Sequence, residues 1–147
     1  MPHATDALNA LGTRERRIYG DQTLDDIEQA CLETAENLGY KIDFRQSHDE
    51  GELVSWIHER KDHMAGLVIN AAAYSHTSIA ILDALLLVKK PVIEVHLSNI
   101  YARERFRHHS HISKAADGVI CGLGLTGYVL ALQALDELLK ARAHMSL

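Results

Sequence analysis

Apolar side chains recur along the chain with two alternating periods, one helical and one strand-like. Residues 24–38 place them at intervals of three and four, the spacing of a helix with one buried face. Thr23 is suited to cap the start of this helix, and Gly39 is suited to end it. Residues 40–45 alternate apolar with charged side chains, which predicts a half-buried strand. The same criteria predict further helices over 50–62, 78–88 and 125–141, and strands over 66–70, 91–95 and 118–121.

The order of these elements predicts an α/β fold. Strands that alternate with helices form a parallel sheet covered on both faces. The runs at 66–70 and 118–121 are continuously apolar, as expected for strands buried on both faces. A chain of 147 residues suits one domain, residues 1–147, with the flavodoxin-like, doubly wound arrangement of five strands.

The first strand of such a sheet is degenerate in this sequence. Residues 1–8 have neither an apolar run nor an alternating pattern, so only four strands are evident. We nevertheless expect this segment to enter the sheet, because a vacant central position would leave the backbone groups of two neighbouring strands unpaired. Natural divergence and an altered N-terminus would both produce such a segment.

Composition narrows the possible functions. The net charge of −5 argues against nucleic acid as the main partner. No apolar run approaches the roughly 20 residues of a membrane span, and the first residues lack a signal-peptide pattern. The two cysteines lie in apolar segments and indicate no disulfide framework, so we expect a cytoplasmic protein. Arginines cluster over 14–17 and 103–107, which suits a small anionic ligand.

The candidate chemistry collects after the predicted strands. Ligands of open parallel sheets bind beyond the carboxyl ends of the strands. Asn70 follows one strand, His96 and Ser98 follow the next, and Gly122 follows the last. These groups form a hydrogen-bonding site without an evident set of metal ligands. His108, His109 and His111 are an alternative metal set, which we disfavour because adjacent histidines rarely reach the same ion.

An ordered series of motifs, running from about Leu8 to Leu139, resembles the type II dehydroquinases. The matching segments are Leu11-Gly12-Thr13-Arg14-Glu15 with Ile18-Tyr19-Gly20, Asn70 with Tyr74-Ser75-His76-Thr77-Ser78, Glu94-Val95-His96-Leu97-Ser98-Asn99, Arg103-Glu104, Phe106-Arg107-His108-His109-Ser110 and Gly118-Val119-Ile120-Cys121-Gly122-Leu123-Gly124. The resemblance implies dehydration of 3-dehydroquinate to 3-dehydroshikimate through an enolate, without a metal, an organic cofactor or a Schiff base.

The resemblance also implies the catalytic residues. Tyr19, on a lid at about residues 9–22, is implied as the base, with Arg14 holding its phenol ionised. A phenol ordinarily ionises near pH 10, so a tyrosinate at neutral pH needs about 4 kcal/mol of stabilisation, which nearby guanidinium groups can supply. His96 is implied as the acid that protonates the departing hydroxyl, and Glu94 as the residue that orients it.

Further positions match substrate-binding residues of the family: Asn70, His76, Leu97, Ser98 and Arg107. Leu97 and Ser98 are implied to present backbone N–H groups to the substrate carboxylate. Asp83 matches an acidic residue that reaches a neighbouring subunit's site, and the implied assembly is a homododecamer built from trimers.

One departure leaves a second function open. The Asn-Gly-Pro-Asn motif of the family aligns with residues 4–7, so Ala7 replaces an Asn that orders a catalytic water. A catalytically impaired homologue with a binding or assembly role is therefore the alternative. A receiver domain of the same topology is disfavoured, because the acidic cluster that receivers need after the first strand is missing.

Overall fold

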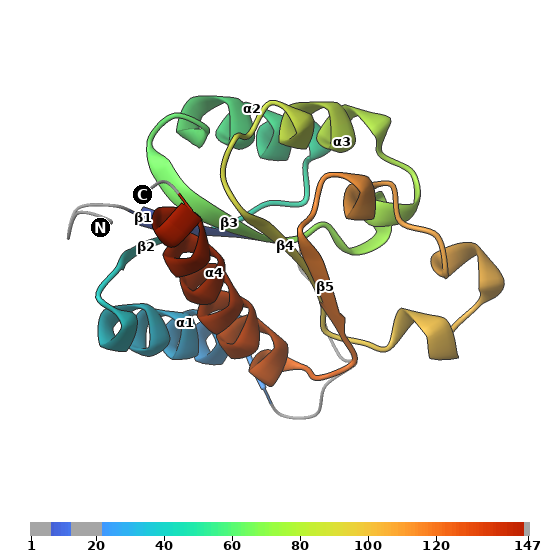
Figure 1. Ribbon diagram of the computed structural model, residues 1–147. Helices are drawn as coiled ribbons and strands as arrows, with labels where there is room; N and C mark the ends of the chain where they lie inside the picture. Colours follow the sequence, from blue (N-terminus) through green and yellow to red (C-terminus); the bar gives the residue numbers. More distant parts are fainter. Residues whose placement is uncertain (1–6, 13–21, 146–147) are drawn as a thin grey trace.

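A five-stranded parallel sheet forms the middle layer of the chain in the computed structural model, which describes residues 7–12 and 22–145 (Figure 1). The spatial order is β2-β1-β3-β4-β5, the doubly wound order of the flavodoxin-like fold, as predicted. The strands are β1 (Ala7–Gly12), β2 (Lys41–Gln46), β3 (Met64–Asn70), β4 (Val92–His96) and β5 (Gly118–Cys121).

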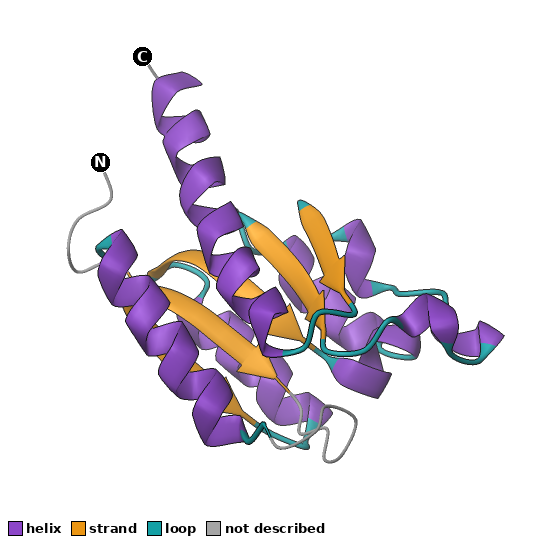
Figure 2. Cartoon of the chain, turned by 90° about the horizontal axis from the view of Figure 1, so that it is seen from below, coloured by secondary structure: helices purple, strands orange, loops and turns teal. Residues whose placement is uncertain are grey.

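Helices cover both faces of this sheet. Helices α1 and α4 lie on one face, and α2 and α3 lie on the other (Figures 1 and 2). Their bounds are α1 (Leu24–Leu38), α2 (Glu50–Arg60), α3 (Ile79–Leu86) and α4 (Leu125–Met145). Within the described part of the chain, no helix is long and apolar enough to cross a membrane.

The predicted ends of α1 are confirmed by its capping contacts. The Asp26 backbone N–H donates to Thr23 Oγ1 at 3.2 Å, and the Thr23 N–H donates to Asp26 Oδ2 at 2.9 Å, a reciprocal capping box. Gly39 ends the helix with a φ of +88°, a backbone conformation that favours glycine.

Strand β1 occupies the centre of the sheet, between β2 and β3. Residues 7 and 8 of the expected segment 1–8 belong to it, and residues 1–6 lie outside the described residues. The strand continues through residues 9–12, where the resemblance predicts the start of the lid. The backbone groups of β2 and β3 that face each other across this position need hydrogen-bond partners. Strand β1 therefore fills the position even though its sequence lacks a clear strand pattern.

The prediction that residues 118–121 are buried on both faces was wrong. β5 pairs with β4 alone and forms one edge of the sheet, and 43% of Val119 is exposed. A continuous apolar run is common to buried strands and to edge strands with one covered face, so the run alone could not distinguish them.

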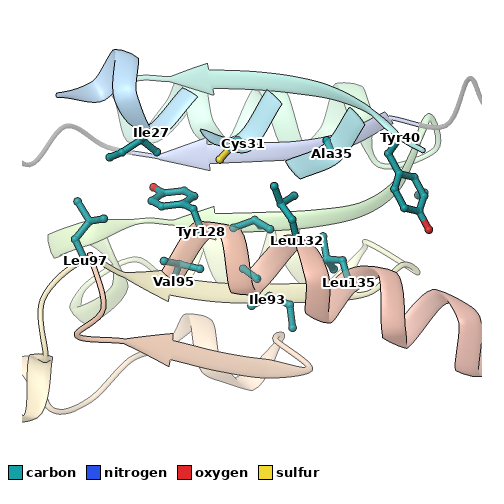
Figure 3. Close-up of a cluster of buried hydrophobic side chains, with 13 residues drawn as sticks. Ile27, Cys31, Ala35, Tyr40, Ile93, Val95, Leu97, Tyr128, Leu132 and Leu135 are labelled. Carbon is teal, nitrogen blue, oxygen red and sulfur yellow. The ribbon is translucent and has the colours of Figure 1, made fainter. Parts of the chain in front are cut away.

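Two apolar cores lie on opposite faces of the sheet. The first packs α1 and α4 against the sheet, and Figure 3 shows Cys31 and Ala35 of α1 opposite Tyr128, Leu132 and Leu135 of α4. The second core joins α2 and α3 to the other face. It contains Leu53, Ile57, Met64, Leu67, Ile69, Ala71, Ile81, Ala84, Leu85, Val88, Val92 and Ile112.

We predict that Leu132→Ala lowers the free energy of unfolding by about 2–5 kcal/mol, because it removes a fully buried side chain and leaves a cavity between α4 and the sheet. Leu130→Ala on the same helix is the matched control, since 38% of Leu130 is exposed. Chemical denaturation measures both losses. Equal losses in the two variants would contradict the assignment of this core.

Candidate active site

The carboxyl ends of the central strands meet at one edge of the sheet. Gly12 at the end of β1 pairs in register with Asn70 at the end of β3. Ile69 pairs with Glu94, so Asn70 and His96 lie at the same edge on neighbouring strands. The sheet therefore brings together the amide and the imidazole that the sequence analysis singled out.

A buried carboxylate and imidazole lie at the end of β4. Glu94 is fully buried, and His96 is only 3% exposed. The His96 Nε2–H donates to Glu94 Oε2. This contact occupies one ring nitrogen and leaves Nδ1 as the one that can deliver a proton. The implied pairing of Glu94 with His96 is thus present in the structure.

Two serines complete the surroundings of Glu94. Ser110 Oγ donates to Oε2 at 2.7 Å, and Ser113 Oγ donates to Oε1 at 2.6 Å. Burial alone would raise the pKa of Glu94. The hydrogen bonds from His96, Ser113 and Ser110, together with the charge of His96, outweigh burial and hold that pKa below its ordinary value.

His76 lies beside His96 and has a defined tautomer. Its Nδ1–H donates to the carbonyl of His109 at 2.7 Å, and a carbonyl can only accept. The two imidazole rings stack with centroids 6.3 Å apart and planes 14° from parallel. The end of η1 (Ala72–His76) thereby places a second imidazole at the same edge of the sheet.

Asn70 is buried, and half of its amide is unpaired among the described residues. Its Oδ1 accepts from the Ala72 backbone N–H at 3.0 Å, whereas Nδ2 has no hydrogen-bond partner. Leaving a buried donor unpaired costs about 1–3 kcal/mol, so this amide is suited to an acceptor atom of a ligand. Ala72 has a φ of +48°, a strained conformation of the kind that clusters at functional sites.

The turn after β4 is tied to the turn after β5. Leu97 and Ser98 are both buried, and the carbonyls of His96 and Leu97 accept from the N–H groups of Gly122 (3.2 Å) and Gly124 (3.1 Å). These contacts fix the backbone that the resemblance assigns to carboxylate binding. The contribution of the Leu97 and Ser98 N–H groups stays a prediction.

Arg107 and Asp83 differ in how they are placed relative to Asn70, His76 and His96. Arg107 belongs to η3 (Arg105–Arg107), which lies against η1, and its Nε donates to Glu104. Asp83 is exposed on α3, and the described contacts do not join it to His96, Asn70 or His76. Arg14 and Tyr19 lie outside the described residues.

The roles of Ser110 and Ser113 were missed by the sequence analysis. A signal was present, because Glu94 interrupts an otherwise apolar strand and a buried charge requires hydrogen-bonding partners. The sequence could not identify those partners, which lie 16 and 19 residues further along the chain.

The histidine-rich segment makes contacts of its own. His108 Nε2 donates to the Arg103 carbonyl at 2.9 Å, and the rings of His109 and His111 meet edge to face with centroids 4.9 Å apart. Within residues 7–12 and 22–145, no group of three or more His, Cys, Asp or Glu side chains is arranged to hold a metal ion.

Comparison with known proteins identifies the family. The sequence model described as dehydroquinase class II matches residues 5–136. The chain belongs to this family. The 3-dehydroquinate dehydratase 1 of Agrobacterium fabrum is 56% identical over 131 residues, covering 89% of this chain and 90% of that relative. The 3-dehydroquinate dehydratase of Brucella canis is 59% identical over 133 residues, covering 90% and 85%.

Solved structures agree with this assignment. The type II dehydroquinase of Propionibacterium acnes is 43% identical, with a TM-score of 0.85, and the match covers 92% of this chain and 99% of that one. The type II dehydroquinase of Butyrivibrio crossotus is 33% identical, also with a TM-score of 0.85, over 90% and 99%. The family and the fold expected from the motifs are both confirmed.

We predict that Gly122→Ala disturbs the site more than its backbone conformation alone requires. Gly122 has a φ of +89°, and a Cβ there would lie 3.0 Å from Asn99 Cβ, in the turn after His96. Strain from φ costs about 1–2 kcal/mol, and the crowding adds about 1–3 kcal/mol.

Gly39→Ala is the matched control for this substitution. Gly39 has a φ of +88°, and nothing lies within 4 Å of its added Cβ. Chemical denaturation of both variants, followed by assay of turnover, should show the larger stability loss and the loss of turnover in Gly122→Ala only. Equal losses of stability, with turnover retained in both, would refute this prediction.

Proposed function

We propose that the chain dehydrates 3-dehydroquinate to 3-dehydroshikimate by anti elimination through an enolate. The observation that carries the proposal is the buried Glu94–His96 pair, beside Asn70 and His76, in a chain of this family. Relatives named 3-dehydroquinate dehydratase at 56% and 59% identity support this substrate. The reaction needs a base for a proton alpha to the ketone, support for the enolate, and an acid for the departing hydroxyl.

Tyr19 is the proposed base, with Arg14 stabilising its ionised phenol. Both residues belong to the segment that follows Gly12. Gly12 itself pairs with Asn70 at the carboxyl ends of β1 and β3. We propose that this segment, which is the part of the expected lid at about residues 9–22 that follows β1, acts as a lid. A guanidinium close to a phenol favours the charged phenolate.

His96 is the proposed acid. When the carbon–oxygen bond breaks, the departing hydroxyl takes the proton from the imidazole and leaves as water, while the enolate electrons form the new double bond. Glu94 accepts the Nε2–H of His96, so the proton for the departing hydroxyl comes from Nδ1. The proposed mechanism uses no metal, organic cofactor or Schiff base.

Five residues are proposed to bind the substrate. Asn70 Nδ2 is a buried donor without a hydrogen-bond partner among the described residues. The His76 ring stacks on His96 and uses Nδ1 for the His109 carbonyl, which leaves Nε2 as its nitrogen for a ligand. The backbone of Leu97 and Ser98 would receive the substrate carboxylate, and Arg107 would add a positive charge. An anionic, hydroxylated substrate matches this set of donors.

A catalytically impaired homologue remains the second candidate. Ala7, which aligns with the water-ordering Asn of the family, pairs in the structure with Lys41 and Met64 at the start of β1. It therefore lies at the amino ends of the strands, whereas His96 lies at the carboxyl end of β4. One missing preorganised donor typically costs about 10²–10³ in rate, but the place of Ala7 at the start of β1, away from His96, weighs against such a loss. Measured turnover of 3-dehydroquinate decides between an enzyme and a binding or assembly protein.

We predict that Tyr19→Phe and His96→Ala each lower kcat by several orders of magnitude, because each removes a group that moves a proton. Absorbance of the conjugated enone product measures turnover. Tyr101→Phe and His58→Ala are the controls, since both residues are exposed in this chain. Near-parental kcat in Tyr19→Phe or in His96→Ala would refute the assigned role. An inactive parent chain would favour the impaired homologue.

Assembly is a separate proposal. We propose a cytoplasmic homododecamer built from trimers, in which Asp83 of one subunit completes the site of its neighbour. The exposure of Asp83, of Ile79 and Leu86 on the same helix, and of Leu87 directly after it supports an interface at α3.

We predict that light scattering gives the mass of twelve chains. Asp83→Ala should raise KM or lower kcat while the mass stays unchanged, because the substitution removes a carboxylate from the neighbour's site without removing apolar contact area. A stable, active monomer would contradict the proposal.

A further inference from the structure

The carboxylate of Glu94 is held from two distant parts of the chain. His96 follows it on the same strand, whereas Ser110 and Ser113 come from the connection between β4 and β5. We propose that Ser110 and Ser113 are positioning residues. Their hydroxyls clamp the two oxygens of Glu94 and thereby hold the His96 imidazole in the tautomer and orientation that deliver a proton. This inference rests on the proposed role of His96.

The geometry uses both oxygens of the carboxylate. Ser113 donates to Oε1, while Ser110 and the His96 ring share Oε2. Two serine bonds on different oxygens restrain rotation of the carboxylate about its terminal bond. A ring bonded to a restrained oxygen is restrained in turn, which keeps Nδ1 of His96 directed away from Glu94.

The donors also match one protonation state of Glu94. An ionised carboxylate accepts only, so a ring N–H and two hydroxyls can all donate to it at once. Glu94 is fully buried, and a buried charge with too few donors is costly. The lowered pKa of Glu94 agrees with this arrangement, because the three hydrogen bonds outweigh the effect of burial.

The connection that carries the serines is itself anchored. Ile112, between them, is fully buried, and the His111 backbone N–H donates to the Ser75 carbonyl at 2.8 Å. The His109 carbonyl accepts from His76 at 2.7 Å. The segment that positions Glu94 and His96 thus also positions the ring of His76.

Few ionisable groups contact this network. Among the described residues, Glu94 and His96 contact each other, and the further titratable side chain in contact with them is His76, whose ring stacks on His96. A pH-dependent effect of the serine substitutions can therefore be assigned to a small set of groups.

Kinetics of Ser113→Ala test the proposal. Loss of one charge-assisted hydrogen bond should lower kcat about tenfold while KM changes less than about twofold, because the hydroxyl contacts Glu94 rather than substrate. Ser113→Thr retains a hydroxyl and should restore most of kcat. Ser55→Ala removes an exposed hydroxyl from α2 and should leave both constants unchanged.

The same substitution in a Glu94→Gln background separates positioning from packing. If Ser113 acts through the charge of Glu94, Ser113→Ala should lower kcat less than about twofold once that charge is gone, so the two effects are not additive. Ser110→Ala should behave in the same way. An equal loss in both backgrounds, or a parental kcat in both serine variants, would overturn the proposal.

A stability measurement tests the network without any activity. Glu94 has a folded pKa below its ordinary value of 4.5, so its stabilising contribution is present above that pH and is lost as the pH falls through the folded pKa. Ser113→Ala weakens this contribution. Its Tm should therefore fall below that of the parent at pH 7, and the difference should shrink as the pH is lowered below about 4.5.

The two measurements distinguish the two proposals. A pH-dependent Tm difference in an inactive parent chain would uphold the clamp on Glu94 and reject the proposed function. An active parent chain whose serine variants match it in kcat and in Tm would reject the clamp and keep the proposed function. A Tm difference that is the same at every pH would assign the serines to packing and overturn the clamp.

Discussion

The buried carboxylate of Glu94 is the constraint on which the site depends. An ion of this kind, placed in the second strand from the edge of a parallel sheet, is tolerated only with a full set of donors. His96, Ser110 and Ser113 supply them. Satisfying this one charge therefore fixes the imidazole at the end of β4 and holds the long connection between β4 and β5 against the sheet.

The parallel sheet determines where this chemistry is presented. Parallel strands direct all their carboxyl ends to one edge, so Asn70 and His96 meet there although 26 positions apart. The anchored connection adds His76 to the same edge through the His109 carbonyl. A substrate that carries a carboxylate, hydroxyls and a ketone matches such a set of amide, imidazole and backbone donors.

At the centre of the sheet, pairing with neighbouring strands determines the conformation of a segment whose own sequence pattern does not predict a strand. Residues 7–12 have no strong strand pattern, yet they pair with β2 on one side and β3 on the other. Backbone hydrogen bonding is available to any residue, and two unpaired neighbours make the position favourable for whichever segment can reach it. This placement sets Gly12, rather than the position of Ala7, next to Asn70.

The sequence by itself determined the α/β class, the order of helices and strands, the family and most of the strand-end residues. Local spacing encodes helices such as α1, and short-range contacts such as the capping box of Thr23 and Asp26 are set by neighbours along the chain. Tertiary structure alone decided that β5 is an exposed edge, that β1 spans Ala7–Gly12, and that Ser110 and Ser113 serve Glu94. The physical reason is the sequence separation of the interacting residues. The spacing of apolar residues indicates which face of an element is buried, whereas hydrogen bonds between residues far apart in sequence form only when the chain packs.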